Sequence, residues 1–263
     1  MYPILFRSGG LTVYAYGFFV GLGFIVGLIL AVRSARKQGV PFERVVDLFF
    51  YSLLSAIVGS RALFVLINFD SFRGHLLSIF RIWEGGLVFY GGLILAVAVS
   101  IAYMRWHRLP IWKLTDLFSP PVALGLVFGR IGCFFAGCCY GKETFLPWAV
   151  TFTDPGSLAR LNVPLHPTQL YEAACGLAIF LFLIWKAPRK AFDGQILWLF
   201  LLFYSVVRFF VESLRDDPRG FVFKNLLSTS QAIGILLAIA SLFMLFYLQR
   251  RDSGIVRIRG PRG

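Results

Sequence analysis

DLFSPPVALGLVFGRIGCFFAGCCYG, residues 116–141, is the stretch of sequence that decides the fold class. Residues 116–135 form an apolar run of the roughly 20 residues that a helix needs to cross a bilayer. Arg130 lies near the end of this run. An arginine at mid-membrane costs about 2.5–3.5 kcal/mol on insertion scales, so such a residue usually faces a polar cavity, a partner or an anionic ligand. The stretch therefore predicts a transmembrane helix with a functional cation.

Two further arginines, Arg61 and Arg208, lie in similar apolar surroundings. Few acidic residues are close to any of the three in the sequence. Three such cations predict a pocket for a ligand that is negatively charged and partly apolar.

The composition of the whole chain agrees with a membrane protein. The 263 residues are 58% hydrophobic and 17% aromatic, and the mean hydropathy is positive. These values predict an all-α, polytopic membrane protein with small outward-facing loops or a small cap. We find no internal repeat, low-complexity linker or cleavable signal peptide, so we expect one integral membrane domain over residues 1–263. The predicted spans, good to about ±2–4 residues, are 14–32, 45–68, 87–104, 116–135, 168–186, 194–214 and 229–248.

The formal charge of +13 does not indicate a nucleic-acid partner, because the cations cluster beside the ends of the predicted helices. About 15 of them fall on one side of the membrane and about 8 on the other, and the positive-inside rule places the richer side in the cytoplasm. The richer set is Arg33, Arg36, Lys37, Arg44, Arg105, Arg108, Lys113, Lys186, Arg189, Lys190, Arg250, Arg251, Arg257, Arg259 and Arg262. The N-terminus is then outside, the C-terminus is cytoplasmic, and all three arginines lie in the outer halves of their helices.

Arg208 and Glu212 are four residues apart on one helix face, so a simple internal ion pair is one explanation for both. Arg130 has no acid nearer than Asp116 in its own predicted helix. A guanidinium binds phosphate through two parallel hydrogen bonds, which favours a phospholipid headgroup as the ligand. For Arg61 a structural role, snorkelling or pairing with a loop acid, is as reasonable as contact with a ligand.

Three cysteines, Cys133, Cys138 and Cys139, follow Arg130 on the predicted outer side, where disulfides can persist. A disulfide or buried thiols is one explanation; a metal site with His166 and a quinone-linked thiol oxidoreductase are two others. The C-x4-C-C spacing is not a recognised zinc pattern, so we expect no metal and no cofactor. His166 precedes Pro167 and Thr168, which fit a helix N-terminus. His166 and Glu172 are either catalytic or residues that cap the helix and form pairs.

Together these residues resemble the prolipoprotein diacylglyceryl transferase family of bacterial inner-membrane enzymes. Gly129–Phe134, continuing to Gly141, is similar to the family's signature segment, and Arg208–Glu212, continuing to Arg215 and Asp217-Pro218, is similar to its second arginine motif. The resemblance extends in order over nearly the whole chain, through Tyr16-Gly17, Ser60-Arg61, Trp83–Gly86, Tyr90–Gly92 and His166–Glu172.

The resemblance implies a seven-helix enzyme that takes phosphatidylglycerol from the membrane lipid. It would transfer the diacylglyceryl group to the lipobox cysteine in the signal peptide of a preprolipoprotein and release glycerol phosphate. Family members carry an essential arginine at the positions of Arg130 and Arg208. This chain departs from the family pattern in three places: Tyr90 replaces a common histidine, Cys133 replaces an asparagine, and Cys138 replaces an acid.

In our mechanistic hypothesis Arg130 and Arg208 bind the phosphate of the lipid, and Tyr90 or His166 accepts the proton of the acceptor thiol. The expected substrate-binding residues are Tyr16, Arg61, Arg130, Gly132, Cys133, Gly141, Arg208 and Glu212. An intramembrane anion or lipid carrier and a membrane thiol oxidoreductase are the alternative functions.

Overall fold

The computed structural model describes residues 2–9, 11–82, 85–216, 221–222 and 227–258. Two parts of the motifs named above, Trp83-Glu84 and Asp217-Pro218, lie outside the described residues.

Within this described part, seven helices are long and apolar enough to cross a membrane, which confirms the predicted all-α membrane fold. The protein is therefore a multi-pass membrane protein. Each predicted span overlaps one helix. The ends differ by at most five residues, except that α7 continues ten residues beyond its predicted end at 248. The helices are α1 (Ala15–Lys37), α2 (Phe42–Ile67), α3 (Phe89–Trp106), α4 (Ile111–Ala136), α5 (Thr168–Lys186), α6 (Gln195–Ser213) and α7 (Thr229–Ile258).

Short elements connect these helices. Three antiparallel hairpins are formed by β1 (Ile4–Ser8) with β2 (Leu11–Tyr14), β3 (Val150–Thr151) with β4 (Pro164–Leu165), and β5 (Phe221–Val222) with β6 (Leu227–Ser228). The 3-10 turns are η1 (Phe69–Phe72), η2 (Leu76–Phe80) and η4 (Ala187–Arg189).

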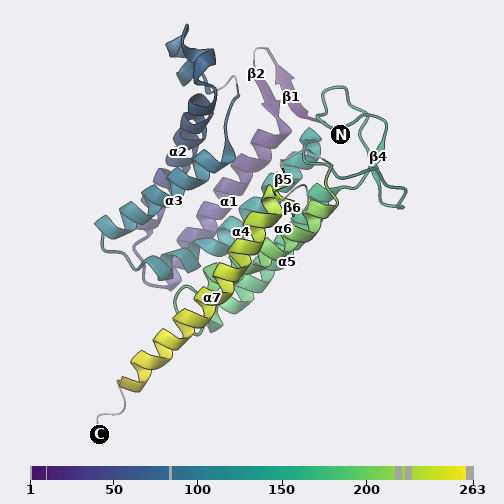
Figure 1. The fold of residues 1–263 in the computed structure, drawn as a ribbon. Helices are drawn as coiled ribbons and strands as arrows, with labels where there is room; N and C mark the ends of the chain where they lie inside the picture. The colour runs from purple at the N-terminus through teal and green to yellow at the C-terminus, as the bar shows by residue number, and fades with distance from the viewer. Residues whose placement is uncertain (1, 10, 83–84, 217–220, 223–226, 259–263) are drawn as a thin grey trace. The chain divides into compact units, whose positions relative to one another are not determined.

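The chain divides into two compact units, residues 1–30 with 115–263 and residues 31–114. In the first unit α5 packs on α6 and α6 packs on α7, and Figure 1 shows these helices side by side in green and yellow. The core of this unit is apolar and consists of Ala123, Ile179, Phe180, Leu183, Ile196 and Phe200. On α7, Leu236, Ile239 and Phe243 are exposed, as expected of side chains that face lipid.

An ion pair between Asp116 and Lys190 lies at one end of the first unit. The Asp116 carboxylate, at the start of α4, accepts hydrogen bonds from Lys190 Nζ at 2.9 Å, Gly194 N at 2.8 Å and Leu197 N at 3.0 Å. The two backbone donors belong to the N-terminal end of α6, whose first N–H groups lack partners within the helix. Asp116 therefore fixes the start of α6 against α4, at the end of the bundle opposite Arg130.

The second unit is held together by close contact of α2 with α3. A Cβ on Gly59 would overlap the Gly91 carbonyl and one on Gly92 would lie 2.7 Å from the Ala56 carbonyl, so the small residues let the two backbones touch. Gly91 and Gly92 thus lie inside α3, and their role in this unit is packing.

Candidate functional site

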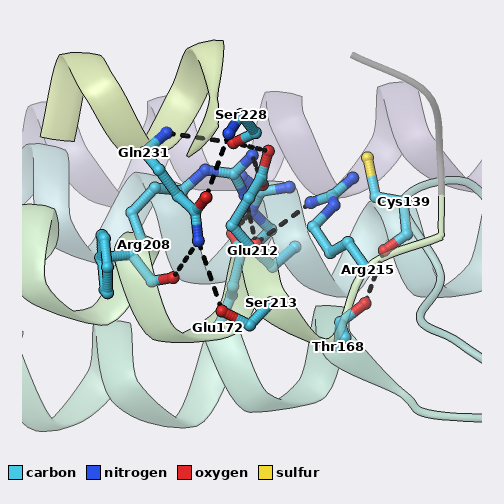
Figure 2. A network of polar contacts seen from close by, with 11 residues as sticks. Cys139, Thr168, Glu172, Arg208, Glu212, Ser213, Arg215, Ser228 and Gln231 are labelled. Atoms are coloured by element: carbon cyan, nitrogen blue, oxygen red, sulfur yellow. Dashed lines mark hydrogen bonds and ion pairs between the residues drawn. The ribbon is translucent and has the colours of Figure 1, made fainter. Parts of the chain in front are cut away.

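The centre of the candidate site is the Glu172 carboxylate, one turn from the start of α5. Its Oε2 lies 2.5 Å from Arg130 Nε of α4, and its Oε1 lies 2.7 Å from Arg208 Nη1 of α6 and 3.1 Å from Arg215 Nη1, just beyond α6. One carboxylate thus joins three guanidinium groups that are distant in the sequence. Figure 2 shows Glu172 with Arg208 and Arg215.

Glu212 completes this arrangement from α6. Its Oε2 lies 2.6 Å from Arg208 Nη2, which confirms the ion pair expected from the four-residue spacing. Its Oε1 accepts a hydrogen bond from Ser228 Oγ at 3.0 Å, and Gln231 of α7 donates to Ser213 Oγ and to the Phe209 carbonyl (Figure 2). The start of α7 therefore braces the carboxylate that holds Arg208.

We call Arg130, Arg208, Arg215, Glu172 and Glu212 the arginine–glutamate network. Three cations and two anions leave it with one net positive charge. The side chains are 17% exposed for Arg130 and between 2% and 9% exposed for the other four. A buried excess of positive charge is costly unless an anion compensates it. The network is therefore suited to an anionic ligand.

Sequence reasoning missed the parts that Glu172 and Arg215 play in this network. Glu172 was considered only as a catalytic residue or as a capping and pairing residue, and Arg215 was noted only within a motif. Their signal was available: Glu172 is an acid one turn inside a predicted span, and a buried acid needs a cationic partner.

A pocket adjoins the network within the first unit. Arg130, Glu172 and Arg208 form its polar wall. The rest of its lining is mainly apolar and comes from α4, α5 and α6: Ala123, Leu126, Gly176, Ile179, Phe200, Tyr204 and Val207. Such a pocket matches a molecule with one anionic group and hydrocarbon chains.

Two predicted site residues, Gly132 and Gly141, are positions of close packing. A Cβ on Gly132 would lie 3.2 Å from Tyr16 Cα, so this glycine lets α4 approach the first turn of α1. A Cβ on Gly141 would lie 2.5 Å from His166 Cβ and 2.8 Å from the Leu214 carbonyl. Gly141 therefore allows the chain to pass between α5 and the end of α6, and Tyr16 is brought next to the signature segment.

Cys133, Cys138 and Cys139 form a second group, which we call the cysteine cluster. All three are thiols, and their Sγ atoms lie within 4.8 Å of one another. Hydrogen bonds with Cys133 and Cys138, followed by the charge of Arg215, lower the pKa of Cys139 below the ordinary range of a thiol. Cys175, the fourth cysteine, lies in α5 outside the cluster.

His166 lies at the junction of β4 and α5. Its Nδ1 is 3.2 Å from the Tyr171 hydroxyl, which accepts a hydrogen bond from Trp148 Nε1 at 2.7 Å. Its backbone N–H donates to the Lys142 carbonyl and its carbonyl accepts from Gly141 N–H. The start of α5 at Thr168 confirms the helix N-terminus predicted from Pro167 and Thr168.

The remaining two predicted site residues, Arg61 and Tyr90, belong to the second unit. The Arg61 guanidinium is buried and donates to the carbonyls of Ser78, Ile79, Gly85 and Gly86 at 2.6–3.3 Å. These contacts give Arg61 a structural role in fixing the segment before α3, with carbonyls as partners rather than the acid we considered. The Tyr90 side chain, in the first turn of α3, is 46% exposed.

Comparison with known proteins decides the family. The pattern of the family described as prolipoprotein diacylglyceryl transferase matches residues 3–247. The chain belongs to the prolipoprotein diacylglyceryl transferase family.

Several relatives named phosphatidylglycerol-prolipoprotein diacylglyceryl transferase are similar over most of their length. The protein of Clostridium tetani is 35% identical over 244 residues, which cover 93% of this chain and 96% of the relative. The protein numbered 2 from Clostridium perfringens is 37% identical over 89% of this chain and 91% of its own. That of Chromohalobacter salexigens is 35% identical over 98% of this chain and 96% of its own. The match to the diacylglyceryl transferase family includes every residue of the arginine–glutamate network and the cysteine cluster.

Proposed function

We propose that this chain transfers the diacylglyceryl group of phosphatidylglycerol to the lipobox cysteine of a preprolipoprotein. The names of its relatives give the donor lipid and the class of acceptor. The observation that carries the proposal is the arginine–glutamate network, with one net positive charge, on the wall of a pocket that is otherwise mainly apolar. A phosphatidylglycerol molecule has one negative charge at its phosphodiester and two hydrocarbon chains, so both parts of the pocket have a counterpart in it.

The hydrogen-bonding capacity of the network also favours an added anion. An arginine offers five N–H donors and an ionised carboxylate about four acceptor sites. Three arginines therefore bring about 15 donors to about 8 acceptor sites on Glu172 and Glu212. Two carboxylates alone therefore cannot occupy every donor of three arginines, and phosphate oxygens supply the kind of acceptor that arginine binds best.

In this proposal Arg130 and Arg208 hold the phosphate as it becomes the leaving group, and Glu212 orients Arg208. The thiolate sulfur forms a bond to the glyceryl carbon while the bond from that carbon to the phosphate oxygen breaks, and the electron pair stays on the oxygen. Charge on the departing oxygen grows during this step, so preorganised guanidinium groups lower its barrier. Tyr16 would contact the headgroup from α1.

The assignments of Arg61 and Tyr90 to substrate, and of Tyr90 or His166 to proton transfer, stay predictions from the sequence. The base has a modest task, because ionising a thiol of ordinary pKa near 8.5 at pH 7 costs only about 2 kcal/mol. Losing an arginine should therefore cost this reaction more than losing a base.

We further propose that the protein lies in the bacterial inner membrane with its N-terminus outside and its C-terminus in the cytoplasm. The distribution of cations beside the helices supports this orientation. The network joins the C-terminal ends of α4 and α6 to the N-terminal ends of α5 and α7, so these four ends are at one level. In the proposed orientation that level is the outer half of the membrane, where the signal peptide of an exported protein presents its cysteine.

The test is incubation of the purified protein with phosphatidylglycerol and a lipobox peptide, followed by measurement of the peptide mass. We expect the wild type to add one diacylglyceryl group and Arg130→Lys and Arg208→Lys to be at least about 100-fold slower, since one lost donor of this kind costs about 10²–10³-fold. Arg73→Lys, at an exposed residue paired with Asp70, is the matched control and should react like the wild type. Wild-type rates in both network variants would contradict the phosphate role, and no transfer by the wild type would contradict the function.

A further inference from the structure

The cysteine cluster has the composition of a metal site. Its three Sγ atoms lie within 4.8 Å of one another, and no other His, Cys, Asp or Glu of the described chain belongs to the group. Three thiolates at about 2.3 Å from one tetrahedral Zn²⁺ lie about 3.8 Å apart, so small side-chain rotations would suffice to bind the ion. Soft thiolate ligands favour zinc or copper(I) over harder cations.

The backbone is specifically shaped to bring these sulfurs together. Cys133 is in the last turn of α4, and the chain reverses at Gly137, with φ of +76°, so that Cys138 N donates to the Cys133 carbonyl at 3.1 Å. Cys139 has φ of +64°, a left-handed conformation that is unfavourable for a residue with a side chain. A conformation of this kind persists only where the surroundings enforce it.

Two residues at the start of α5 enforce the turn. Thr168 Oγ1 donates to the Cys139 carbonyl at 2.7 Å, as seen in Figure 2, and Gln169 Nε2 donates to the Cys138 carbonyl at 2.7 Å. Both side chains are buried, and Gln169 Oε1 has no hydrogen-bond partner among the described residues. The hydrogen bonds to its two carbonyls therefore fix the conformation of the turn, and the buried Gln169 Oε1 beside it is an acceptor without a described donor.

The number of ligands indicates the kind of site. Structural zinc sites have four protein ligands, whereas catalytic sites have three and keep one position open. His166 is not part of this group, so among the described residues the three cysteines are the candidate ligands. Cys138 and Cys139 are partly exposed, so the open position can be reached.

The charge of the neighbourhood also suits zinc. Arg130 interacts electrostatically with Cys133 and Cys139, and Arg215 with Cys139. Three thiolates carry one net negative charge around Zn²⁺ and two around copper(I). Zinc therefore places less negative charge beside the arginine–glutamate network, whose one positive charge the proposed function assigns to the phosphate.

We infer that Cys133, Cys138 and Cys139 bind one Zn²⁺ and that its open position takes the acceptor cysteine of the preprolipoprotein as a thiolate. This departs from our expectation of no metal, and it rests on the proposed function. The acceptor thiol loses its proton to water when its sulfur binds the ion. Its sulfur then forms the bond to the glyceryl carbon, the carbon–oxygen bond breaks, and the phosphate oxygen keeps the electron pair. In this proposal zinc ionises the acceptor thiol, so the reaction needs no separate general base. No atom is oxidised or reduced.

The first measurement is metal content. Purified wild type should contain about one zinc per chain by elemental mass spectrometry, and Cys138→Ser should contain less than about one fifth of that. Cys175→Ser is the matched control and should keep the metal, since its thiol lies outside the cluster. A wild type that binds no zinc after incubation with it, or in which two cluster cysteines form a disulfide that excludes it, would overturn the inference whatever the lipidation assay shows.

The second measurement uses the wild type alone, so it does not depend on how a variant folds. Cobalt(II) replaces the zinc, and its thiolate charge-transfer absorption should change when a lipobox peptide is added without any lipid. A peptide with serine in place of the cysteine should leave the spectrum unchanged. Equal spectra with both peptides would overturn the role of the open position and leave the transferase proposal intact.

The third measurement is the pH dependence of transfer. At pH 7 only about 3% of an ordinary thiol is ionised, so removing zinc with a chelator should slow transfer roughly 10–30-fold. The chelated enzyme should recover rate as the pH rises from 7 to 9, and added zinc should restore the rate at pH 7. If chelation removes the metal and changes neither rate nor pH profile, the inference is wrong, whereas absence of transfer in the zinc-loaded wild type contradicts the proposed function instead.

Discussion

Replacing Glu172 by glutamine changes only one atom type in the side chain, and we expect it to destabilise the arginine–glutamate network strongly. Glutamine keeps the length and nearly the volume of the side chain but removes the charge that three arginines share at 2.5, 2.7 and 3.1 Å. The net charge of the arginine–glutamate network rises from one to two positive charges. The side chain is only 5% exposed, so water cannot compensate the loss.

The expected cost follows from this burial. Removing one partner of a buried ion pair destabilises a protein by about 3–5 kcal/mol, because the remaining charge has no counterion. In a chain of this size each kcal/mol lowers the melting temperature by about 2–4 °C. We therefore expect Glu172→Gln to lower the midpoint of thermal unfolding in detergent by roughly 6–20 °C. Glu172→Asp keeps the charge but cannot reach all three arginines, so its midpoint should lie between the two.

Glu143→Gln provides the control, because it makes the same chemical change at an exposed residue outside the network. Its midpoint should stay within about 2 °C of the wild type, as is usual for surface substitutions. An equally small change in Glu172→Gln would refute the reasoning, since it would mean that the arginines are stable without this carboxylate and that the count of charges in the site is wrong.

Three further predictions concern contacts outside the arginine–glutamate network, one in the first unit and two in the second. Asp116→Asn should cost about 1–3 kcal/mol in thermal unfolding, because it weakens three hydrogen bonds that fix the start of α6; an unchanged midpoint would exclude that role. Gly92→Ala should lower the free energy of unfolding by about 1–3 kcal/mol, since its methyl group would overlap α2. Gly21→Ala, with open space around it, is the control and should be neutral or stabilising. Equal effects of the two substitutions would contradict close packing at Gly92. Arg61→Lys should speed proteolysis of residues 76–86, because one ammonium cannot replace contacts to four carbonyls; an unchanged digestion pattern would argue against this anchor.

The helices and one ion pair could be predicted from the sequence for simple physical reasons. A transmembrane helix is a local feature, because its length and apolar composition are properties of one continuous segment. The pairing of Arg208 with Glu212 is local too, since residues four apart share a helix face. The start of α5 followed from the conformational preference of Pro167 and Thr168.

The rest of the site depends on contacts between distant segments. Glu172 binds arginines from α4, α6 and the segment after α6, and no periodicity in the sequence shows that these ends meet. The partners of Arg61 are backbone carbonyls, which every residue has and which therefore leave no signal in the sequence. The approach of Cys133 to Cys139 requires two left-handed residues, Gly137 and Cys139, of which only the glycine is an obvious turn residue.

Under the proposed function, the arrangement of charge explains how a membrane enzyme can keep three arginines ready for a phosphate. Without carboxylates, three guanidinium groups in one apolar bundle would repel one another and lose their hydration, a cost that no resting protein sustains. With a separate carboxylate for each arginine, the site would be neutral and an arriving phosphate would have to displace an ion pair. Two carboxylates for three arginines avoid both problems, because Glu172 shares its charge among all three and leaves one positive charge for the ligand. Phosphate binding then adds to the network, and the guanidinium groups need not move far when charge develops on the leaving oxygen.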